Sequence, residues 1–239
     1  MRLDKLLGNN GFGTRKDVKQ LVRKGIVRVN GATEKDPGAH VDPEIDIVDV
    51  LGERVIHQEF IYLMMNKPPG VISATEDKWD QTVIDLLDED AQRFEPFPVG
   101  RLDKDTEGLL IITNDGKITH ELLSPKKDIP KTYYAKIDGV VTEDDKKAFA
   151  EGVTLEDGFH TKPGILNILV SDTISEIELT ITEGKFHQVK RMFEAVEKTV
   201  VYLKRLSMGE LELDDSLELG HYRELTMDEL EKLDPRKKG

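Results

Sequence analysis

The chain has 239 residues and no cysteine; 38% of its residues are hydrophobic and 34% are charged. This length suits one large domain or two smaller ones, and the apolar share is enough to form a buried core. The absence of cysteine excludes disulfides, thiolate nucleophiles and cysteine-based zinc sites.

The net charge of −13 argues by itself against nucleic acid as a partner, because a polyanion is repelled by a surface of the same sign. The charge is unevenly distributed, however, since residues 1–30 carry a net charge of +6 and the rest of the chain carries −19. This asymmetry fits a basic contact module on an acidic body or a solvated amphipathic helix, and charge alone favours neither. The basic residues of this segment are Arg2, Lys5, Arg15, Lys16, Lys19, Arg23, Lys24 and Arg28.

Residues 1–58 predict a small first domain of helix and short strands, with residues 51–59 as the candidate linker. Alternating apolar residues and a turn-forming Asn-Gly pair indicate the strands, and a capping threonine followed by an apolar stripe indicates the helix. The expected elements are a helix over 15–24 that is capped by Thr14 and stopped by Gly25, a strand over 26–29, a turn at Asn30-Gly31 and further short strands through 45–50.

Residues 59–239 predict a second domain, and its pattern of segregated helices and alternating strands favours an α+β fold with a mixed, mostly antiparallel sheet. No apolar run is long enough to span a bilayer and none follows Met1, so we expect no membrane span, no signal peptide and a cytoplasmic protein. The expected strands cover 61–65, 109–113, 133–137, 165–170, 177–181 and 200–206. The expected helices cover 82–87, a short segment that follows the turn at 114–116 and ends at 123, 143–151, 188–196 and a last segment opened by a capping box at 226–229.

Patterns typical of cofactor and metal sites are weak in this sequence. Gly11-Phe12-Gly13 looks like the start of a dinucleotide-binding loop, but position 16 is lysine rather than glycine and no strand precedes it. The six histidines never lie four residues apart, as a helical zinc motif requires. We therefore expect neither a cofactor nor a metal site.

One segment carries a highly specific string. Residues 99–116 read VGRLDKDTEGLLIITNDG, with polar residues between Gly100 and Gly108 just before an apolar strand. For an anonymous Asp-Lys-Asp triplet, a surface turn would be the better interpretation. The segment, however, resembles the G-R-L-D-x-x-T-x-G-L motif of RNA pseudouridine synthases at every signature position. The resemblance implies that Asp103 is the essential aspartate and that Arg101 can fill the space left by a flipped-out base.

Two further segments resemble motifs of the same family in the same order. Lys131-Thr132-Tyr133 is similar to its K-x-Y motif, whose tyrosine lies against the target base, although a core tyrosine is the alternative interpretation. Residues 183–192, EGKFHQVKRM, resemble the E-G-x-x-H-Q-V-K/R-R-M motif. Lys190 stands where the family has a basic partner for the aspartate, and Arg191 is the alternative partner; an exposed cationic helix start would explain both without function. Glu197 departs from the family, which usually has glycine there, and this affects the end of the preceding helix.

The N-terminal segment from Arg2 to Gly31 resembles the S4 RNA-binding domain. An S4 domain followed by a synthase domain is the arrangement of the small-subunit branch, and residues 187–193 and 220–226 look most like members that act on 16S ribosomal RNA. On this basis the residues expected to bind RNA are Arg2, Arg15, Lys16, Lys19, Arg23, Arg101 and Arg191.

The resemblance therefore implies a monomeric isomerase in rRNA processing that converts one uridine of 16S rRNA to pseudouridine, with Asp103, Tyr133 and Lys190 as catalytic residues. The reaction breaks an N-glycosidic bond and rejoins the uracil through carbon, so it needs no redox cofactor or group donor. A carboxylate can act in it as nucleophile or as base, and a neighbouring cation favours its charged form. The partner would be free rRNA or a small-subunit assembly intermediate. A synthase acting on 23S rRNA and a non-catalytic S4 ribosome-assembly factor are the alternatives.

Overall fold

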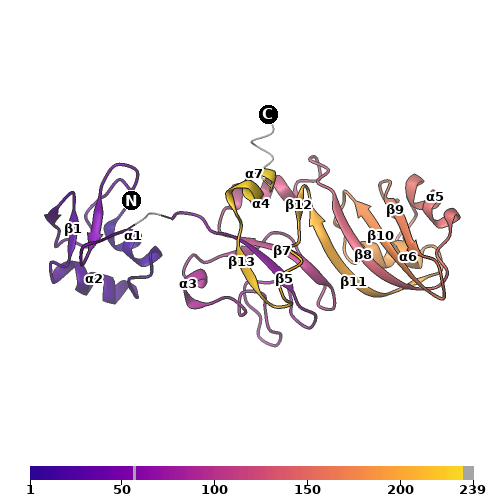
Figure 1. Cartoon of the computed structure of the whole chain (residues 1–239), viewed down its shortest axis with the longest axis horizontal. Coiled ribbons are helices and arrows are strands. Elements are labelled where there is room, and N and C mark those ends of the chain that lie inside the picture. Colours follow the sequence, from indigo (N-terminus) through magenta and orange to yellow (C-terminus); the bar gives the residue numbers. More distant parts are fainter. Residues whose placement is uncertain (56–57, 234–239) are drawn as a thin grey trace. The chain divides into compact units, whose positions relative to one another are not determined.

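The computed structural model describes residues 1–55 and 58–233, and the chain divides into two compact units (Figure 1). The first unit contains Met1–Ile61 together with Asp88–Pro96. The second contains Tyr62–Leu87 together with the chain from Phe97 onward. Each unit combines helices with a sheet, as expected of an α+β chain.

The first unit packs two helices against a small sheet. Its core consists of leucines from α1 and valines from α2 and the strands, and the sheet has the order β2-β1-β3-β4. The helix expected over 15–24 and the turn at Asn30-Gly31 are confirmed, whereas α1 and α3 were not anticipated. The elements are α1 (Leu3–Asn9), α2 (Arg15–Arg23), β1 (Val27–Val29), β2 (Ala32–Thr33), β3 (Val48–Val50), β4 (Glu53–Arg54) and α3 (Glu89–Gln92).

The second unit is built on one sheet with the strand order β13-β5-β7-β11-β8-β10-β9. Its neighbouring strands are antiparallel except β7 and β11, which pair in parallel, so the expected mixed, mostly antiparallel sheet is confirmed. The strands are β5 (Tyr62–Lys67), β6 (Phe97–Pro98), β7 (Glu107–Thr113), β8 (Lys131–Asp138), β9 (Ile165–Val170), β10 (Ile174–Ile181), β11 (Thr199–Met208), β12 (Leu211–Glu212) and β13 (Tyr222–Glu224). The helices are α4 (Gly116–Leu123), α5 (Glu143–Glu151), α6 (Gln188–Glu194) and α7 (Met227–Leu233).

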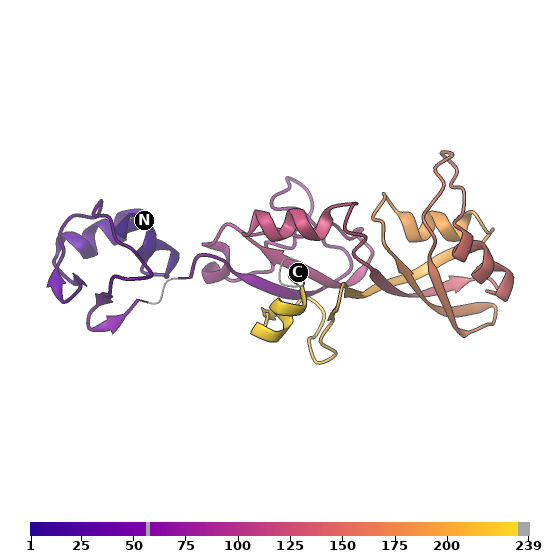
Figure 2. The ribbon, with the colours of Figure 1, turned by 90° about the horizontal axis from the view of Figure 1, so that it is seen from above.

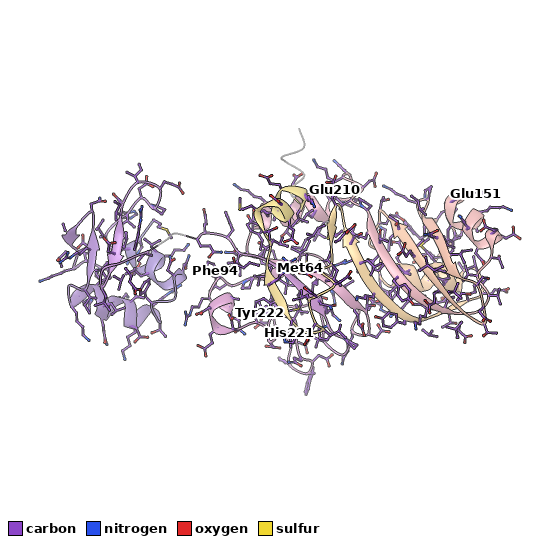
Figure 3. All side chains as sticks on the ribbon, in the orientation of Figure 1. Met64, Phe94, Glu151, Glu210, His221 and Tyr222 are labelled. Carbon is purple, nitrogen blue, oxygen red and sulfur yellow. The ribbon has the colours of Figure 1, made fainter. Side chains whose placement is uncertain are left out.

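The two halves of this sheet differ in how their residues are buried. β5 and β7 are buried almost throughout and read as continuous apolar runs, because both of their faces are covered. In Figure 2, α4 lies along one face of these strands, where Ile118 and Leu122 join the core around Met64 (labelled in Figure 3). β8 and β10 instead alternate between buried and less buried residues. In β10 this alternation is the period-two pattern that predicts the strand over 177–181.

The prediction of a helix over residues 82–87 is wrong. Thr82 forms a β-bridge with Ile72, and the chain then turns through bends before reaching α3. The carboxylate of Asp85 accepts hydrogen bonds from the backbone nitrogen and the hydroxyl of Thr82, at 2.8 and 2.9 Å. This bonding is the kind that starts a helix, but the bridge of Thr82 to Ile72 and the burial of Val83 and Leu87 hold the segment as a turn.

The turn after α6 contains Glu197, at the position where the family usually has glycine. This residue adopts a left-handed conformation with φ of 59°. The next backbone nitrogen, that of Lys198, donates to the carbonyl of Phe193 at 2.9 Å. Such a helix end favours glycine, because a Cβ in this conformation crowds the backbone. The helix therefore ends in the usual way, with a strained glutamate at the position where glycine fits best.

Replacing Glu197 with glycine should therefore stabilise the protein by about 0.5–1 kcal/mol. Glycine removes the left-handed penalty of about 1–2 kcal/mol, but its greater conformational freedom in the unfolded chain offsets part of that gain. The change would be measured by denaturant unfolding. The matched control is Glu194→Gly, the same substitution at the last residue of α6, which should destabilise by up to about 1 kcal/mol. Equal effects of the two variants would show that the backbone at position 197 carries no strain.

Candidate active site

The loop between β6 and β7 carries Asp103 and is fixed by backbone contacts from residues far away in sequence. Ser73 uses its hydroxyl both to donate to the carbonyl of Leu102 and to accept from the nitrogen of Leu102, each at 3.0 Å. The nitrogen of Gly70 donates to the carbonyl of Lys104 at 2.7 Å. The loop is thereby attached to residues 70–73, which follow β5, and Asp103 occupies a defined position.

A buried lysine lies beneath the same loop. Lys67, at the end of β5, is fully inaccessible to solvent, and its ammonium group donates to the carbonyls of Thr106, Pro68 and Lys104 at 2.8, 3.0 and 3.4 Å. Burial lowers the pKa of Lys67 to about 8, against the opposing effect of the nearby acidic side chains of the loop. The strand expected over 61–65 stops short of this lysine, although a lysine that closes an apolar strand is unusual enough to suggest a structural role.

Gly108 follows the loop at the point where β7 meets β11. Its φ is 102°, and a Cβ built there would lie 2.3 Å from the carbonyl oxygen of Arg205. Residues 108 and 205 are direct partners in the short parallel pairing of the two strands. Only glycine allows this approach. The close contact therefore explains why the G-R-L-D-x-x-T-x-G-L string has glycine at this position.

The ammonium group of Lys190, in the first turn of α6, joins this loop to the helix. It lies 3.2 Å from a carboxylate oxygen of Asp103 and 2.7 and 2.9 Å from the two oxygens of Asp105. Burial acts to lower the pKa of Lys190, but the hydrogen bonds to Asp105 and the charge of Asp103 outweigh it and leave that pKa raised. Burial likewise acts to raise the pKa of Asp105, and the Lys190 ammonium reverses the effect, so this pKa is lowered.

His187 supplies a second group near Asp103 that the sequence did not single out. Its Nε2 lies 3.6 Å from the other carboxylate oxygen of Asp103, and its backbone is left-handed, with φ of 50°, where it caps α6. Strained non-glycine residues of this kind concentrate at functional sites. Its place in the string EGKFHQVKRM was the signal that could have found it.

A pocket opens beside Asp103 between the loop, the start of α6 and the strands. Tyr133 of β8 lies in its wall with only 8% of its surface exposed, while Arg101 lines it from the exposed side of the loop. The predicted residues Asp103, Tyr133 and Arg101 therefore share one pocket, and Lys190 contacts Asp103 from α6. The lining residues are Arg101, Leu102, Asp103, Thr106, Tyr133, Ile181, Gly184, Lys185, His187, Gln188, Val189 and Leu203.

The remaining predicted residues lie elsewhere. Arg191 pairs with Asp157 at 2.6 Å, so Lys190 rather than Arg191 is the cation that contacts Asp103. Arg2 pairs with Asp4 at 2.8 Å in the first unit. The predicted basic residues of α2 are all exposed, and they are Arg15, Lys16, Lys19 and Arg23.

This arrangement places the carboxylate of Asp103 and the ring of Tyr133 in the wall of one pocket. Asp103 has a quarter of its side chain exposed, to the pocket, with a cation on one oxygen and an imidazole near the other. Such a carboxylate is suited to act as nucleophile or base on a ligand in the pocket. Among residues 1–55 and 58–233, histidine and acidic side chains form no cluster of three or more that could hold a metal ion, and none of the helices has the length and apolar character of a membrane span.

Replacing Lys190 with methionine should slow turnover at pH 7 by roughly 10- to 100-fold, as expected for the loss of a hydrogen bond between charged groups, worth about 1.5–3 kcal/mol. The deficit should be present across pH 6 to 9, the range over which Lys190 keeps its charge in the wild type. Because the pKa of Lys190 is raised, its ion pairs form fully below the amine's ordinary pKa and are lost only above it, so they should persist in the wild type from pH 6 to 9.

Lys104→Met is the control for this experiment, because Lys104 adjoins Asp103 in sequence but pairs with Asp80 at 2.5 Å. It should turn over at about the wild-type rate. A Lys190→Met enzyme with the wild-type rate would exclude the ion pair from catalysis.

Comparison with known proteins places these features in context. The family model for RNA pseudouridylate synthase matches residues 61–195, and the S4 domain model matches residues 1–47. The chain is 56% identical to an uncharacterized RNA pseudouridine synthase of Bacillus subtilis, over 96% of this chain and 97% of that one. It is 40% identical to ribosomal small subunit pseudouridine synthase A of Vibrio vulnificus, over 97% and 98% of the two chains, and 39% identical to ribosomal large subunit pseudouridine synthase B of B. subtilis, over 97% and 95%.

Proposed function

The chain belongs to the family of RNA pseudouridine synthases, and from this premise we propose that it isomerises a specific uridine of 16S ribosomal RNA, with Asp103 as its catalytic carboxylate. One observation carries the assignment of Asp103: its carboxylate faces the pocket lined by Tyr133 and contacts Lys190 at 3.2 Å. The non-catalytic S4 factor is set aside, because the synthase family model covers residues 61–195.

Isomerisation requires the N1–C1′ bond of uridine to break and a C5–C1′ bond to form, after which C5 loses its proton and N1 gains one. The carboxylate of Asp103 can begin this either by attacking the nucleoside or by removing a sugar proton, and both routes need it to be charged. The ammonium group of Lys190 lies 3.2 Å from one oxygen of this carboxylate, and Nε2 of His187 lies 3.6 Å from the other. The ring of Tyr133 gives the detached uracil a surface on which to stay and turn.

The choice of 16S over 23S rRNA rests on the chain's own residues. The relatives that act on the two subunits are almost equally similar to this chain, at 40% and 39% identity. The segments 187–193 and 220–226 favour the small-subunit branch, and in the structure the first of them begins at the pocket. Free 16S rRNA or a small-subunit assembly intermediate would be the substrate, and the protein would act as a monomer.

Asp103→Asn should abolish tritium release from [5-³H]uridine-labelled 16S rRNA, because the amide can act neither as nucleophile nor as base. Asp105→Asn is the matched control. It makes the same change two residues away, and both side chains contact Lys190. The control should keep activity within about tenfold, since it removes only one hydrogen bond to a charged group, worth about 1.5 kcal/mol at the lower end.

Activity of Asp103→Asn near that of the wild type would sink the catalytic assignment. Equal loss in both variants would mean that the cluster matters for structure rather than for one reacting carboxylate. Labelled 23S rRNA, assayed in parallel, should release no tritium above background; release from 23S but not 16S rRNA would reverse the choice of substrate.

The first unit would supply RNA affinity rather than chemistry. Its S4 domain match covers α1, α2 and β1, and the basic residues of α2 lie exposed at spacings of three and four that share a helix face. Contacts to phosphates of this kind position an RNA and depend on salt without reading its sequence. The acidic remainder of the chain would then discourage RNA binding elsewhere.

A triple variant that replaces Lys16, Lys19 and Arg23 with glutamine should bind 16S rRNA more weakly, and the slope of log affinity against log salt should fall by roughly 0.7–0.9 for each phosphate that is no longer neutralised. Binding would be measured by filter retention across a salt series. The control replaces Lys136, Lys146 and Lys147 of the second unit with glutamine and removes the same charge. If both triple variants show equal decreases in affinity and slope, the effect is one of net charge and α2 is only a solvated face.

A further inference from the structure

Phe186 is an exposed aromatic residue held at the rim of the pocket. Its side chain is 76% exposed, and its ring stacks on the imidazole of His187 with centroids 3.7 Å apart and an interplanar angle of 18°. A single exposed phenylalanine is ordinary in a protein surface. This one differs because its neighbours in sequence, Lys185 and His187, both line the pocket that contains Asp103.

The segment that presents Phe186 is fixed by hydrogen bonds rather than loosely attached. The side chain of Gln188, only 4% exposed, accepts from the backbone nitrogen of Lys185 and donates to the carboxylate of Glu183, both at 2.9 Å. The ammonium group of Lys185 lies 4.8 Å from the ring centroid of Phe159. Together with the left-handed backbone of His187, these contacts hold the Phe186 ring with one face on the imidazole and the other open.

We propose that the open face of Phe186 stacks on an RNA base that flanks the target uridine. The inference rests on the proposed function, because it takes the pocket to receive a flipped-out uridine. Flipping that nucleotide removes a stacking partner from its neighbours, and a ring at the pocket rim can replace it. Base–aromatic stacking is tolerant of base identity, since every base has a π-face, so Phe186 would strengthen binding of the opened strand without choosing its sequence. The imidazole of His187 extends the stack towards Asp103.

The first test measures turnover of 16S rRNA by variants at this position. Phe186→Ala should lower kcat/KM by roughly 5- to 150-fold, the loss of one base–aromatic stack. Phe186→Leu keeps an apolar side chain but no flat ring, and it should behave like alanine. Phe186→Trp should stay within twofold of the wild type. A merely structural role would instead favour leucine over tryptophan, and equal unfolding midpoints would confirm that all three variants fold alike.

The second test observes the stack directly and does not depend on turnover. The chain has one tryptophan, Trp79, so Trp79→Phe combined with Phe186→Trp places a single fluorophore at the pocket rim, and Asp103→Asn prevents reaction. Adding 16S rRNA should quench its fluorescence saturably. The control fluorophore is Ile165→Trp in the same background, at a site on β9 that is 74% exposed and lies outside the pocket lining.

The proposal is overturned if Phe186→Ala retains kcat/KM within twofold of the wild type, or if RNA that binds by anisotropy quenches position 186 no more than position 165. Failure of the proposed function would look different. The wild type would then release no tritium, while quenching at position 186 would still report whether RNA stacks there.

Discussion

The shared ammonium group of Lys190 is the interaction on which the rest of the site depends. It connects a loop before β7 to the first turn of α6, two segments some 85 residues apart in sequence, through contacts with Asp103 and Asp105. Two carboxylates so close together would repel each other without a cation between them. Because Asp103 and Asp105 form one ion-pair cluster with Lys190, the loop and the start of α6 have to fold together. The left-handed backbone of His187 belongs to this same helix start.

Beneath this cluster, the fold fixes the loop by satisfying its backbone from inside. The ammonium group of Lys67 donates to three carbonyls in a region that water does not reach, and the closely packed pair Gly108 and Arg205 sets where β7 begins. Burying a charged amine is costly unless its donors are satisfied. The Asp103 carboxylate is therefore held on a rigid support. A reaction that breaks and re-forms a glycosidic bond on one bound base requires such a fixed position.

The sequence predicted most of the fold, because the strands of the second unit follow clear periods of apolar residues. Strand 165–170 and helix 143–151 were located to the residue. The failures are local: residues 82–87 carry helix-starting hydrogen bonds but are held in a turn by a bridge to Ile72, and α1 and α3 were not recognised. Short elements of this kind depend on tertiary contacts that no sequence window contains.

At the site, the motif residues Asp103, Tyr133 and Lys190 could be named from the sequence, and the structure brings them to one place. What the sequence could not give was the sharing of Lys190 with Asp105, or the approach of His187 to the carboxylate. Those are distances between side chains from separate elements, and a motif specifies residue types rather than distances.

The proposed isomerisation of a ribosomal RNA uridine through Asp103 can be tested directly in cells. The most direct measurement is a nucleotide-resolution map of pseudouridine in the ribosomal RNA of the source cells, with and without the gene and with the gene restored as wild type or as Asp103→Asn. We predict that one pseudouridine of 16S rRNA disappears with the gene, returns with the wild type and stays absent with the variant. Identical maps in all four strains would contradict the proposal.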